Sequence, residues 1–293
     1  MGRGCRLQDD RRAAVSYLRA SRILRRRQKG GSRVVSAVAE RMLKRKVKMR
    51  RRIFHRLIGF FVLLMVTSGN LLAAPFDSQA FRQILKNHRT IVRSGSISYA
   101  GIRYDDPALR ALSAKAKADV EAYTGSTPAE WKAFYINAYN IAVIHVIATN
   151  WPVRSILDLE DGKVFQSPRV LIQGRRISLD DLEKKVLRPS DDPRIHFALV
   201  CAAIGCPDLR AEPYMPVTLD AQLNDQTVRY LNSARGAIVS GNTLRLSKLF
   251  EWYAADFKDA RAFVARYRKL PHGLRPLTDI EYDWRVNSFP EVK

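Results

Sequence analysis

One segment constrains the fold of this chain more than any other. From Trp131 to Ala148 the residues are apolar on nearly every side when they are placed on a helix. A surface helix of a globular protein shows a single apolar stripe, so a helix of this kind has to be buried. The capping box at 127–130, with a proline at its first helical position, marks the start, and Pro152 marks the end. We therefore expect a buried central helix over about residues 128–149.

The segments around this helix predict further helices and short hairpins. Capping residues and helical spacing indicate helices at 78–91, 107–123, 178–187, 218–231, 247–253 and 260–268. Short apolar runs and turn glycines indicate an extended piece at 96–102, hairpins at 170–177 and 237–246, a buried strand at 195–201 and a late strand or ordered tail at 282–284. Helices dominate, and no strand–helix–strand alternation or glycine-rich phosphate loop is visible. The sequence predicts an α+β fold: a mainly helical single domain with a small, largely antiparallel sheet.

The region before residue 75 has the physical character of an export signal. Met49 to Arg56 form a basic stretch, Leu57 to Val66 form a ten-residue apolar stretch, and small residues follow up to Ala74. Ten apolar residues are too few to span a bilayer comfortably, which needs about 20. We expect residues 49–74 to be a signal peptide that is cleaved after Ala73 or Ala74. The alternative is an uncleaved anchor, with membrane contact through residues 53–72.

The net charge of +23 suggests a nucleic-acid binder until its distribution is considered. Residues 1–74 carry +17 of this charge, and residues 75–293 carry only +6. We therefore expect no nucleic-acid partner for the working domain. Residues 1–48 are a basic extension that is either disordered or the product of a start codon assigned too early, with Met49 as the true initiator. A real basic tail that touches anionic lipid or nucleic acid is the alternative. Residues 75–293 are expected to form one globular domain.

Four ordered motifs resemble a known family. They are WKAFYINAYN at 131–140, GRRISLDDLE at 174–183, DPRIHFALVCAAIGCP at 192–207 and YDW at 282–284. Together they resemble the domain of unknown function 547 (DUF547) family, which occurs in bacterial exported proteins and as a C-terminal domain in plant proteins. The resemblance covers about residues 81–287 and implies no secure activity. Two positions depart from the family pattern: Lys184 stands where a histidine is common, and Gly205 where a serine is common. A role built on that histidine would not carry over to this chain.

Cys201 and Cys206 are the two cysteines beyond residue 75. In an oxidising compartment this Cys-x4-Cys pair could close into a disulfide across a turn at Gly205. Two independent thiols and a reactive nucleophile are the other two possibilities. The spacing differs from the thioredoxin-like Cys-x-x-Cys, and the absence of a second pair argues against a zinc site. We expect no metal and no cofactor.

A thiol enzyme would need an imidazole near the sulfur and a third group that orients the ring. His196 with Cys206 or Cys201 supplies the first two groups, and Asn137, Asn140 or Asp208 could be the orienting group. If 195–201 is a strand, His196 and Cys201 face opposite sides, an objection that Cys206 escapes. The alternative for His196 is a buried ring bonded to the backbone.

The polar residues of the central helix have two interpretations. Asn137 and Asn140 share one helix face, and buried amides must find partners. They either tie down a neighbouring loop or, with Tyr135 and Asp208, line a polar pocket or an oxyanion site. Acidic pairs elsewhere sit in turns and caps, where local hydrogen bonding explains them.

Two classes of function therefore remain. The first hypothesis is an exported, periplasmic or cell-envelope binding or structural module, with an unknown protein or envelope ligand as partner. The second is a cysteine-dependent hydrolase or acyl transferase of papain- or transglutaminase-like type that uses Cys206 or Cys201 with His196. The location is expected to be periplasmic or extracellular, or else anchored to the inner membrane with the domain outside the cytoplasm.

Overall fold

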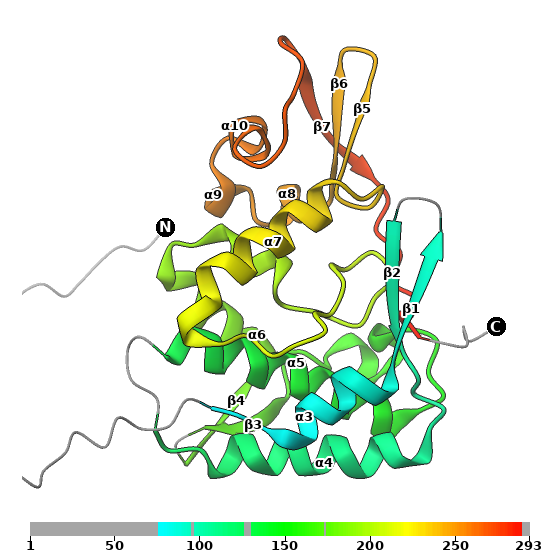
Figure 1. Ribbon diagram of the computed structural model, residues 1–293, viewed down its shortest axis with the longest axis vertical. Coiled ribbons are helices and arrows are strands. Elements are labelled where there is room, and N and C mark those ends of the chain that lie inside the picture. Colours follow the sequence, from blue (N-terminus) through cyan, green and yellow to red (C-terminus); the bar gives the residue numbers. More distant parts are fainter. Residues whose placement is uncertain (1–75, 95–96, 126–129, 173, 289–293) are drawn as a thin grey trace, which may run out of the picture. The chain divides into compact units, whose positions relative to one another are not determined.

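The computed structural model describes residues 76–94, 97–125, 130–172 and 174–288 (Figure 1). The predicted basic extension, the signal segment and the capping residues Thr127 and Pro128 lie outside these ranges. Within the described part of the chain, no helix is both long enough and apolar enough to cross a membrane.

The described residues form a mainly helical α+β fold with small sheets, as predicted. The α-helices are α3 (Gln79–Gln83), α4 (Pro107–Ala122), α5 (Trp131–Asn150), α6 (Leu179–Asp181), α7 (Leu219–Leu231), α8 (Leu249–Trp252), α9 (Ala254–Phe257) and α10 (Ala260–Ala265). Two π-helical turns extend α3 and α6, namely η2 (Ile84–His88) and η5 (Leu182–Leu187). The 3-10 turns are η3 (Ile156–Asp158), η4 (Glu160–Gly162), η6 (Arg188–Ser190), η7 (Pro193–Phe197) and η8 (Pro216–Thr218).

The strands form three separate small sheets rather than one. Their bounds are β1 (Arg89–Ser94), β2 (Ile97–Ile102), β3 (Pro168–Ile172), β4 (Arg175–Ser178), β5 (Ala237–Ser240), β6 (Thr243–Ser247) and β7 (Arg275–Ile280). Three hairpin pairs are antiparallel, and β7 adds to β6 in parallel. β7 was not predicted, because its largely exposed residues give little hydrophobic alternation.

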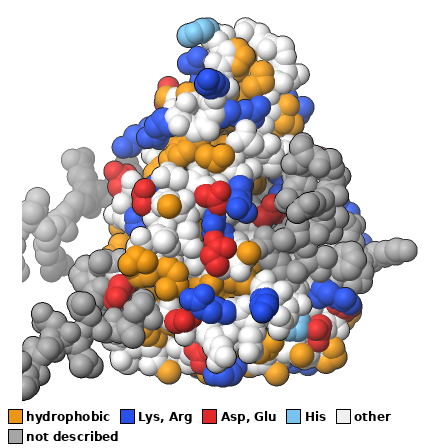
Figure 2. All heavy atoms as spheres, viewed as in Figure 1, with side chains coloured by type: hydrophobic (Ala, Val, Ile, Leu, Met, Phe, Trp, Pro, Cys, Tyr) orange, Lys and Arg blue, Asp and Glu red, His pale blue; other side chains and the backbone are white. Residues whose placement is uncertain are grey.

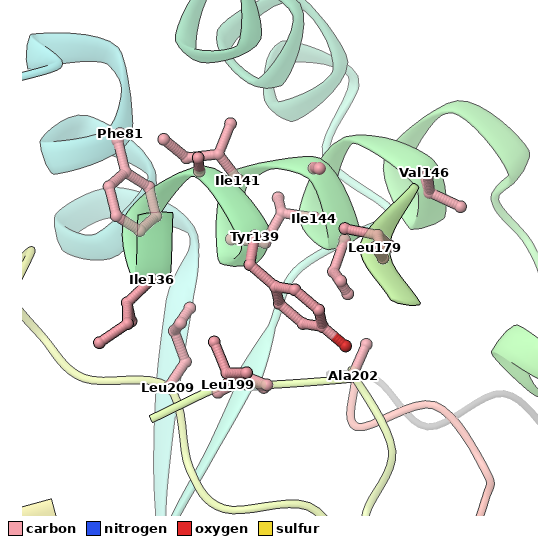
Figure 3. Close-up of a cluster of buried hydrophobic side chains, with 14 of the residues drawn as sticks. Phe81, Ile136, Tyr139, Ile141, Ile144, Val146, Leu179, Leu199, Ala202 and Leu209 are labelled. Atoms are coloured by element: carbon pink, nitrogen blue, oxygen red, sulfur yellow. The ribbon is translucent and has the colours of Figure 1, made fainter. Parts of the chain in front are cut away.

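The buried central helix is confirmed as α5. Fourteen of its twenty residues are buried, so it has no solvent face. Figure 3 shows α5 side chains pointing in several directions: Phe81 of α3 lies on one side of the helix, and Leu199, Ala202 and Leu209 lie on the other. Because α5 has apolar surface on all sides, the other core residues pack around it.

A second core cluster is built by the C-terminal elements. Phe197, Phe250, Phe257 and Phe263 meet ring to ring, together with Tyr230 of α7. Phe197 is the last residue of η7. Ile195, two residues earlier, and Ala198, the next residue, belong to the cluster around α5, so this turn reaches both clusters.

The predicted strand at 195–201 is wrong. Pro193 starts a 3-10 turn, η7, and the Asp192 side chain caps it by accepting a hydrogen bond from the backbone N–H of Arg194. The following residues run as irregular chain without a partner strand. The apolar run is buried as expected, but short apolar runs do not distinguish a strand from a buried turn. The first predicted helix also ends earlier than expected, at His88, because Ile91 belongs to β1.

Candidate functional site

Asn140 fixes the chain just before the first cysteine. Its amide nitrogen donates to the Ala198 carbonyl at 3.0 Å, and its amide oxygen accepts from the Val200 backbone N–H at 2.9 Å. The segment entering Cys201 therefore receives from one side chain the hydrogen bonds that a strand partner would otherwise supply. A buried amide paired in this way on both atoms orders a loop.

Asn137 does the same for a different loop. It donates to the Tyr214 carbonyl at 2.7 Å and accepts from the Tyr214 backbone N–H at 2.9 Å. Tyr135 packs against Trp131 and Phe134. Asp208 accepts from Arg235 at 2.9 Å. The contacts of these three predicted site residues are therefore with a loop, with aromatic rings and with Arg235.

The loop that joins the cysteines is pinned by the end of the chain. Ile204 N–H donates to the Arg285 carbonyl and Gly205 N–H donates to the Asp283 carbonyl, both at 2.8 Å. Arg235 adds hydrogen bonds to the carbonyls of Ile204 and Cys206. These contacts bring Tyr282 and Trp284 beside the cysteines, although about 80 residues separate them in the sequence.

Cys201 and Cys206 are both free thiols, and their sulfur atoms lie 2.9 Å apart. Cys201 is partly exposed, and the Tyr282 hydroxyl lies 3.2 Å from its sulfur. Cys206 is only 2% exposed, and its sulfur accepts a hydrogen bond from the Cys201 backbone N–H at 3.0 Å. The loop at 202–205 thus brings the sulfurs together, with Ala202 in the left-handed region at φ 65°.

The two thiols differ in acidity. Hydrogen bonding from Cys206, followed by that from the Tyr282 hydroxyl, holds the pKa of Cys201 below its ordinary value, against an opposing effect of burial. Burial, and then the neighbouring Cys201, raises the pKa of Cys206 well above its ordinary value. The thiolate is the nucleophilic form, so Cys201 is the reactive member and Cys206 the buried proton-bearing partner.

His196 belongs to an ion-pair chain beside the thiols. Its Nε2 lies 2.7 Å from the Asp256 carboxylate, and Arg188 binds the same carboxylate with two nitrogens at 2.7 and 2.8 Å. The ring stacks on Tyr253 with centroids 3.8 Å apart. Burial lowers the pKa of His196 to about 4, with Asp256 opposing. The ring is therefore neutral near pH 7, and because a carboxylate only accepts, Nε2 carries the proton.

Glu183 is the least compensated carboxylate of the region. It lies on η5 and is 7% exposed, and its Oε1 has no hydrogen-bond partner among the described residues. Burial raises its pKa, and the neighbouring Tyr253 partly offsets that effect. Lys184, where the resemblance expects a histidine, pairs with Asp180 at 2.8 Å at the surface.

These groups surround one cavity of about 190 Å³. We call it the thiol pocket; it is lined by Tyr139, Phe165, Asp180, Glu183, His196, Leu199, Cys201, Cys206, Pro207, Leu249, Trp252, Tyr253, Tyr282 and Trp284. Trp252, Tyr282 and Trp284 contact one another ring to ring and form an aromatic wall. The pocket therefore has a thiol side, a carboxyl and imidazole side, and an aromatic side. No group of three or more metal-ligating side chains occurs within the described ranges.

The structure brings together only some of the residues that the sequence analysis selected. His196, Cys201 and Cys206 line the same pocket, whereas Asn137, Tyr135 and Asp208 do not. His196 and Cys201 were expected to face opposite sides of a strand, but the segment is not a strand and both residues line the pocket. Within the described residues, however, His196 makes no hydrogen bond to either sulfur.

Four important residues escaped the sequence analysis as site residues. Glu183 and Tyr282 stood inside the quoted motifs, so a signal for them existed. Tyr253 had no signal beyond its place in a predicted helix, and Asp256 had none, because their role depends on contacts across some 60 residues.

The comparisons with known proteins give one match. Residues 123–231 match the family model described as "Protein of unknown function, DUF547". No curated protein and no solved structure matches the chain. The matched range contains α5, Glu183, His196 and both cysteines, whereas the Tyr253 and Tyr282 side of the pocket lies beyond it. This chain therefore contains a DUF547 family domain at residues 123–231.

Proposed function

We propose that this protein is a dithiol enzyme that exchanges disulfides with its substrate through Cys201 and Cys206. The observation that carries the proposal is the pair of free sulfurs 2.9 Å apart in the wall of the thiol pocket. A disulfide is about 2.05 Å long, so the two sulfurs need to approach by less than 1 Å to form one. The unequal burial and acidity of the two thiols assign each a different task.

The exchange takes two steps. The Cys201 thiolate attacks one sulfur of a substrate disulfide, whose S–S bond breaks; the first substrate thiolate leaves and takes a proton. Cys206 then loses its proton and attacks the Cys201 sulfur, which forms the Cys201–Cys206 disulfide and releases the second substrate thiolate. Two electrons pass from the protein dithiol to the substrate. An external dithiol regenerates the enzyme, and the reverse sequence oxidises a dithiol substrate.

The second candidate is the cysteine-dependent hydrolase or acyl transferase. The His196–Asp256–Arg188 chain favours it, because an imidazole held by a carboxylate is the usual partner of a nucleophilic thiol. Two observations weigh against it. The ring makes no hydrogen bond to either sulfur among the described residues, and acyl transfer gives no role to a buried second thiol beside the nucleophile.

Cysteine variants of the full chain separate these functions. In a Cys5→Ser background, which removes the third thiol, the reduced protein should react with 2-hydroxyethyl disulfide and lose both alkylatable thiols. Cys206→Ser should stop the reaction at a mixed disulfide on Cys201. Cys201→Ser should slow it by about 100-fold or more, because the remaining thiol is buried and has a raised pKa. Intact mass after alkylation without reductant distinguishes all three products.

Three results would overturn the proposal in different ways. An unchanged rate in Cys201→Ser would exclude that residue as the nucleophile. Cys201-dependent cleavage of a thioester without formation of a protein disulfide would favour the acyl-transfer candidate. Ligand binding that survives replacement of both cysteines, with no thiol reaction at all, would favour the binding module.

We also propose that the protein is exported through residues 49–74. The support is the order of basic, apolar and small residues in that segment and the concentration of positive charge before residue 75. The intact mass of the protein from its native host should correspond to a chain that begins at Ala74 or Pro75. A chain that retains residues 49–74 in the membrane fraction would favour the uncleaved anchor.

A further inference from the structure

The charged side chains that line the thiol pocket are all acidic. Its lining includes two carboxyl residues, Asp180 and Glu183, and no lysine or arginine. Its histidine is neutral near pH 7. Asp180 is already paired with Lys184 at 2.8 Å, so the carboxylate that lacks a positive partner is Glu183.

The charge of Arg188 acts on Glu183, but the Arg188 guanidinium is bound to another carboxylate. Its Nε and Nη2 both bind Asp256, at 2.7 and 2.8 Å. Glu183 is only 7% exposed, and its Oε1 has no hydrogen-bond partner in the described part of the chain. The Tyr253 hydroxyl is hydrogen-bonded to the carboxyl group, so the unsatisfied atom is Oε1, and a buried oxygen of this kind is unfavourable unless something donates to it. The pocket is thus prepared for a ligand group that carries N–H donors.

The aromatic side of the pocket favours a positive charge on that group. Trp252 and Trp284 stack with centroids 5.7 Å apart, and Tyr282 meets both rings. Trp252 remains 44% exposed, so this wall keeps free surface for a ligand. Aromatic faces attract ammonium and guanidinium groups, and a carboxylate nearby strengthens the preference.

We propose that the thiol pocket is an ammonium-binding site, in which Glu183 and the aromatic wall of Trp252, Tyr282 and Trp284 hold an amine-bearing ligand beside Cys201. The identity of the substrate rests on the proposed function as well: a disulfide-exchange enzyme with this site takes a small disulfide that carries a primary amine. The site itself does not depend on thiol chemistry, so the two proposals can fail separately.

Binding is tested with probes that contain no sulfur. The full chain is titrated with 1,6-diaminohexane, 1,6-hexanediol and adipate, which have chains of similar length and carry positive, neutral and negative ends, and tryptophan fluorescence is followed. We expect the diamine to bind about tenfold or more tightly than the diol, with adipate weakest. Glu183→Gln should bring the diamine and the diol to within about threefold of each other, because it removes the charge but keeps the shape.

The control variant is Asp181→Asn. It removes the same charge two residues away, on a side chain that is 43% exposed, paired with Lys185 and not part of the pocket lining. The diamine preference should persist in it. If Glu183→Gln fails to fold by circular dichroism, the salt dependence of the parent protein decides: diamine affinity should fall with ionic strength while diol affinity stays constant. Equal binding of diamine and diol by the folded parent protein, at all salt concentrations, would overturn the site.

Reactive disulfides link the site to the chemistry. Cystamine, 2-hydroxyethyl disulfide and 3,3′-dithiodipropionate carry two amines, two hydroxyls and two carboxylates around the same S–S bond. Their rates with the protein are divided by their rates with N-acetylcysteine to remove intrinsic reactivity. We expect cystamine to be preferred and Glu183→Gln to abolish the preference. Equal corrected rates for the three disulfides would refute the ammonium site and leave the dithiol function standing. Glu183-dependent diamine binding without any disulfide reaction would refute the dithiol function and leave the ammonium site standing.

Discussion

At the scale of single residues, Cys201 and Cys206 acquire different chemistry from their surroundings alone. Both are thiols, and four residues separate them. One is open to the pocket and receives hydrogen bonds that favour its thiolate, and the other is enclosed. Nothing in the sequence distinguishes them, because the groups that lower the pKa of Cys201 are Cys206 itself and Tyr282, 81 residues further along.

Tyr282→Phe tests this assignment. The change removes the hydroxyl that lies 3.2 Å from the Cys201 sulfur and keeps the ring in the aromatic wall. A hydrogen bond to a charged group contributes about 1.5–3 kcal/mol, so the pKa of Cys201 should rise by about one unit or more. At pH 7 the alkylation rate of Cys201 by iodoacetamide should therefore fall by about tenfold.

Tyr230→Phe is the matched control. The Tyr230 hydroxyl donates to the Gly205 carbonyl at 3.0 Å but does not bond to a sulfur, so its loss should lower stability without changing the pH profile of alkylation. Equal pH profiles for the parent protein and Tyr282→Phe would contradict the role given to Tyr282.

At the scale of elements, the loop between the cysteines depends on close contact with the C-terminal segment. A Cβ atom on Gly205 would lie 2.9 Å from the Asp283 backbone nitrogen and 3.0 Å from the Tyr282 ring. The first contact involves backbone, so relief requires a shift of the chain. Glycine is therefore needed here for space, and the serine that the resemblance led us to expect at this position would require a different separation of the two segments.

Gly205→Ala is expected to cost about 1–3 kcal/mol of unfolding free energy, as overpacking in a filled site does. It should also slow the exchange reaction, because Tyr282 and the cysteine loop move apart. Urea unfolding and the 2-hydroxyethyl disulfide assay measure the two effects.

Ala202→Gly in the same loop provides the comparison. Ala202 has φ 65°, which glycine adopts without strain, so this change should leave stability within about 1 kcal/mol of the parent protein. A Gly205→Ala protein as stable and as reactive as the parent would show that the two segments can separate freely.

At the scale of the whole molecule, the thiol pocket lies where two cores meet. His196 lies between Ile195, which belongs to the core around α5, and Phe197, which belongs to the C-terminal core. On the face drawn in Figure 2, acidic and basic side chains are interspersed with hydrophobic ones. This distribution agrees with the modest net charge of residues 75–293.

The buried neutral His196 should make the global stability depend on pH. Its pKa is about 6.5 when unfolded and about 4 when folded, because burial disfavours the charged ring. The unfolded chain therefore binds more protons between these values, and stability is lost as pH falls from 6.5 toward 4. The difference in unfolding free energy between the parent protein and His196→Gln should shrink by about 2 kcal/mol from pH 7 to pH 5.

The comparison of the parent protein with His196→Gln separates the contribution of His196 to the pH dependence of stability from that of Glu183. Burial raises the pKa of Glu183, so its contribution falls as pH rises through that pKa, opposite to His196. Glu183 is present in both proteins and cancels in the difference. A difference that stays constant between pH 5 and pH 7 would show that His196 is not held neutral by the fold.

Features that depend on local rules were predictable from the amino-acid sequence alone. A helix apolar on all sides has to be buried wherever its partners come from, so α5 was predictable. Ser78, Asp106 and Ser178 cap their helices from within a few residues, and Gly241 makes its hairpin turn in the same local way. The ordered motifs also identified the DUF547 domain. These features need no knowledge of distant contacts.

The composition of the site depends on contacts between residues that are distant in the sequence. Whether the apolar run at 195–201 becomes a strand depends on a partner strand, and Asn140 supplies the hydrogen bonds instead. Asp256 meets His196 across 60 residues and Tyr282 meets Cys201 across 81, with side-chain directions set by packing. Hydrophobic pattern fixes which residues are buried. It does not fix which polar groups are buried together, and in this protein the pocket is formed by polar groups that tertiary packing brings together.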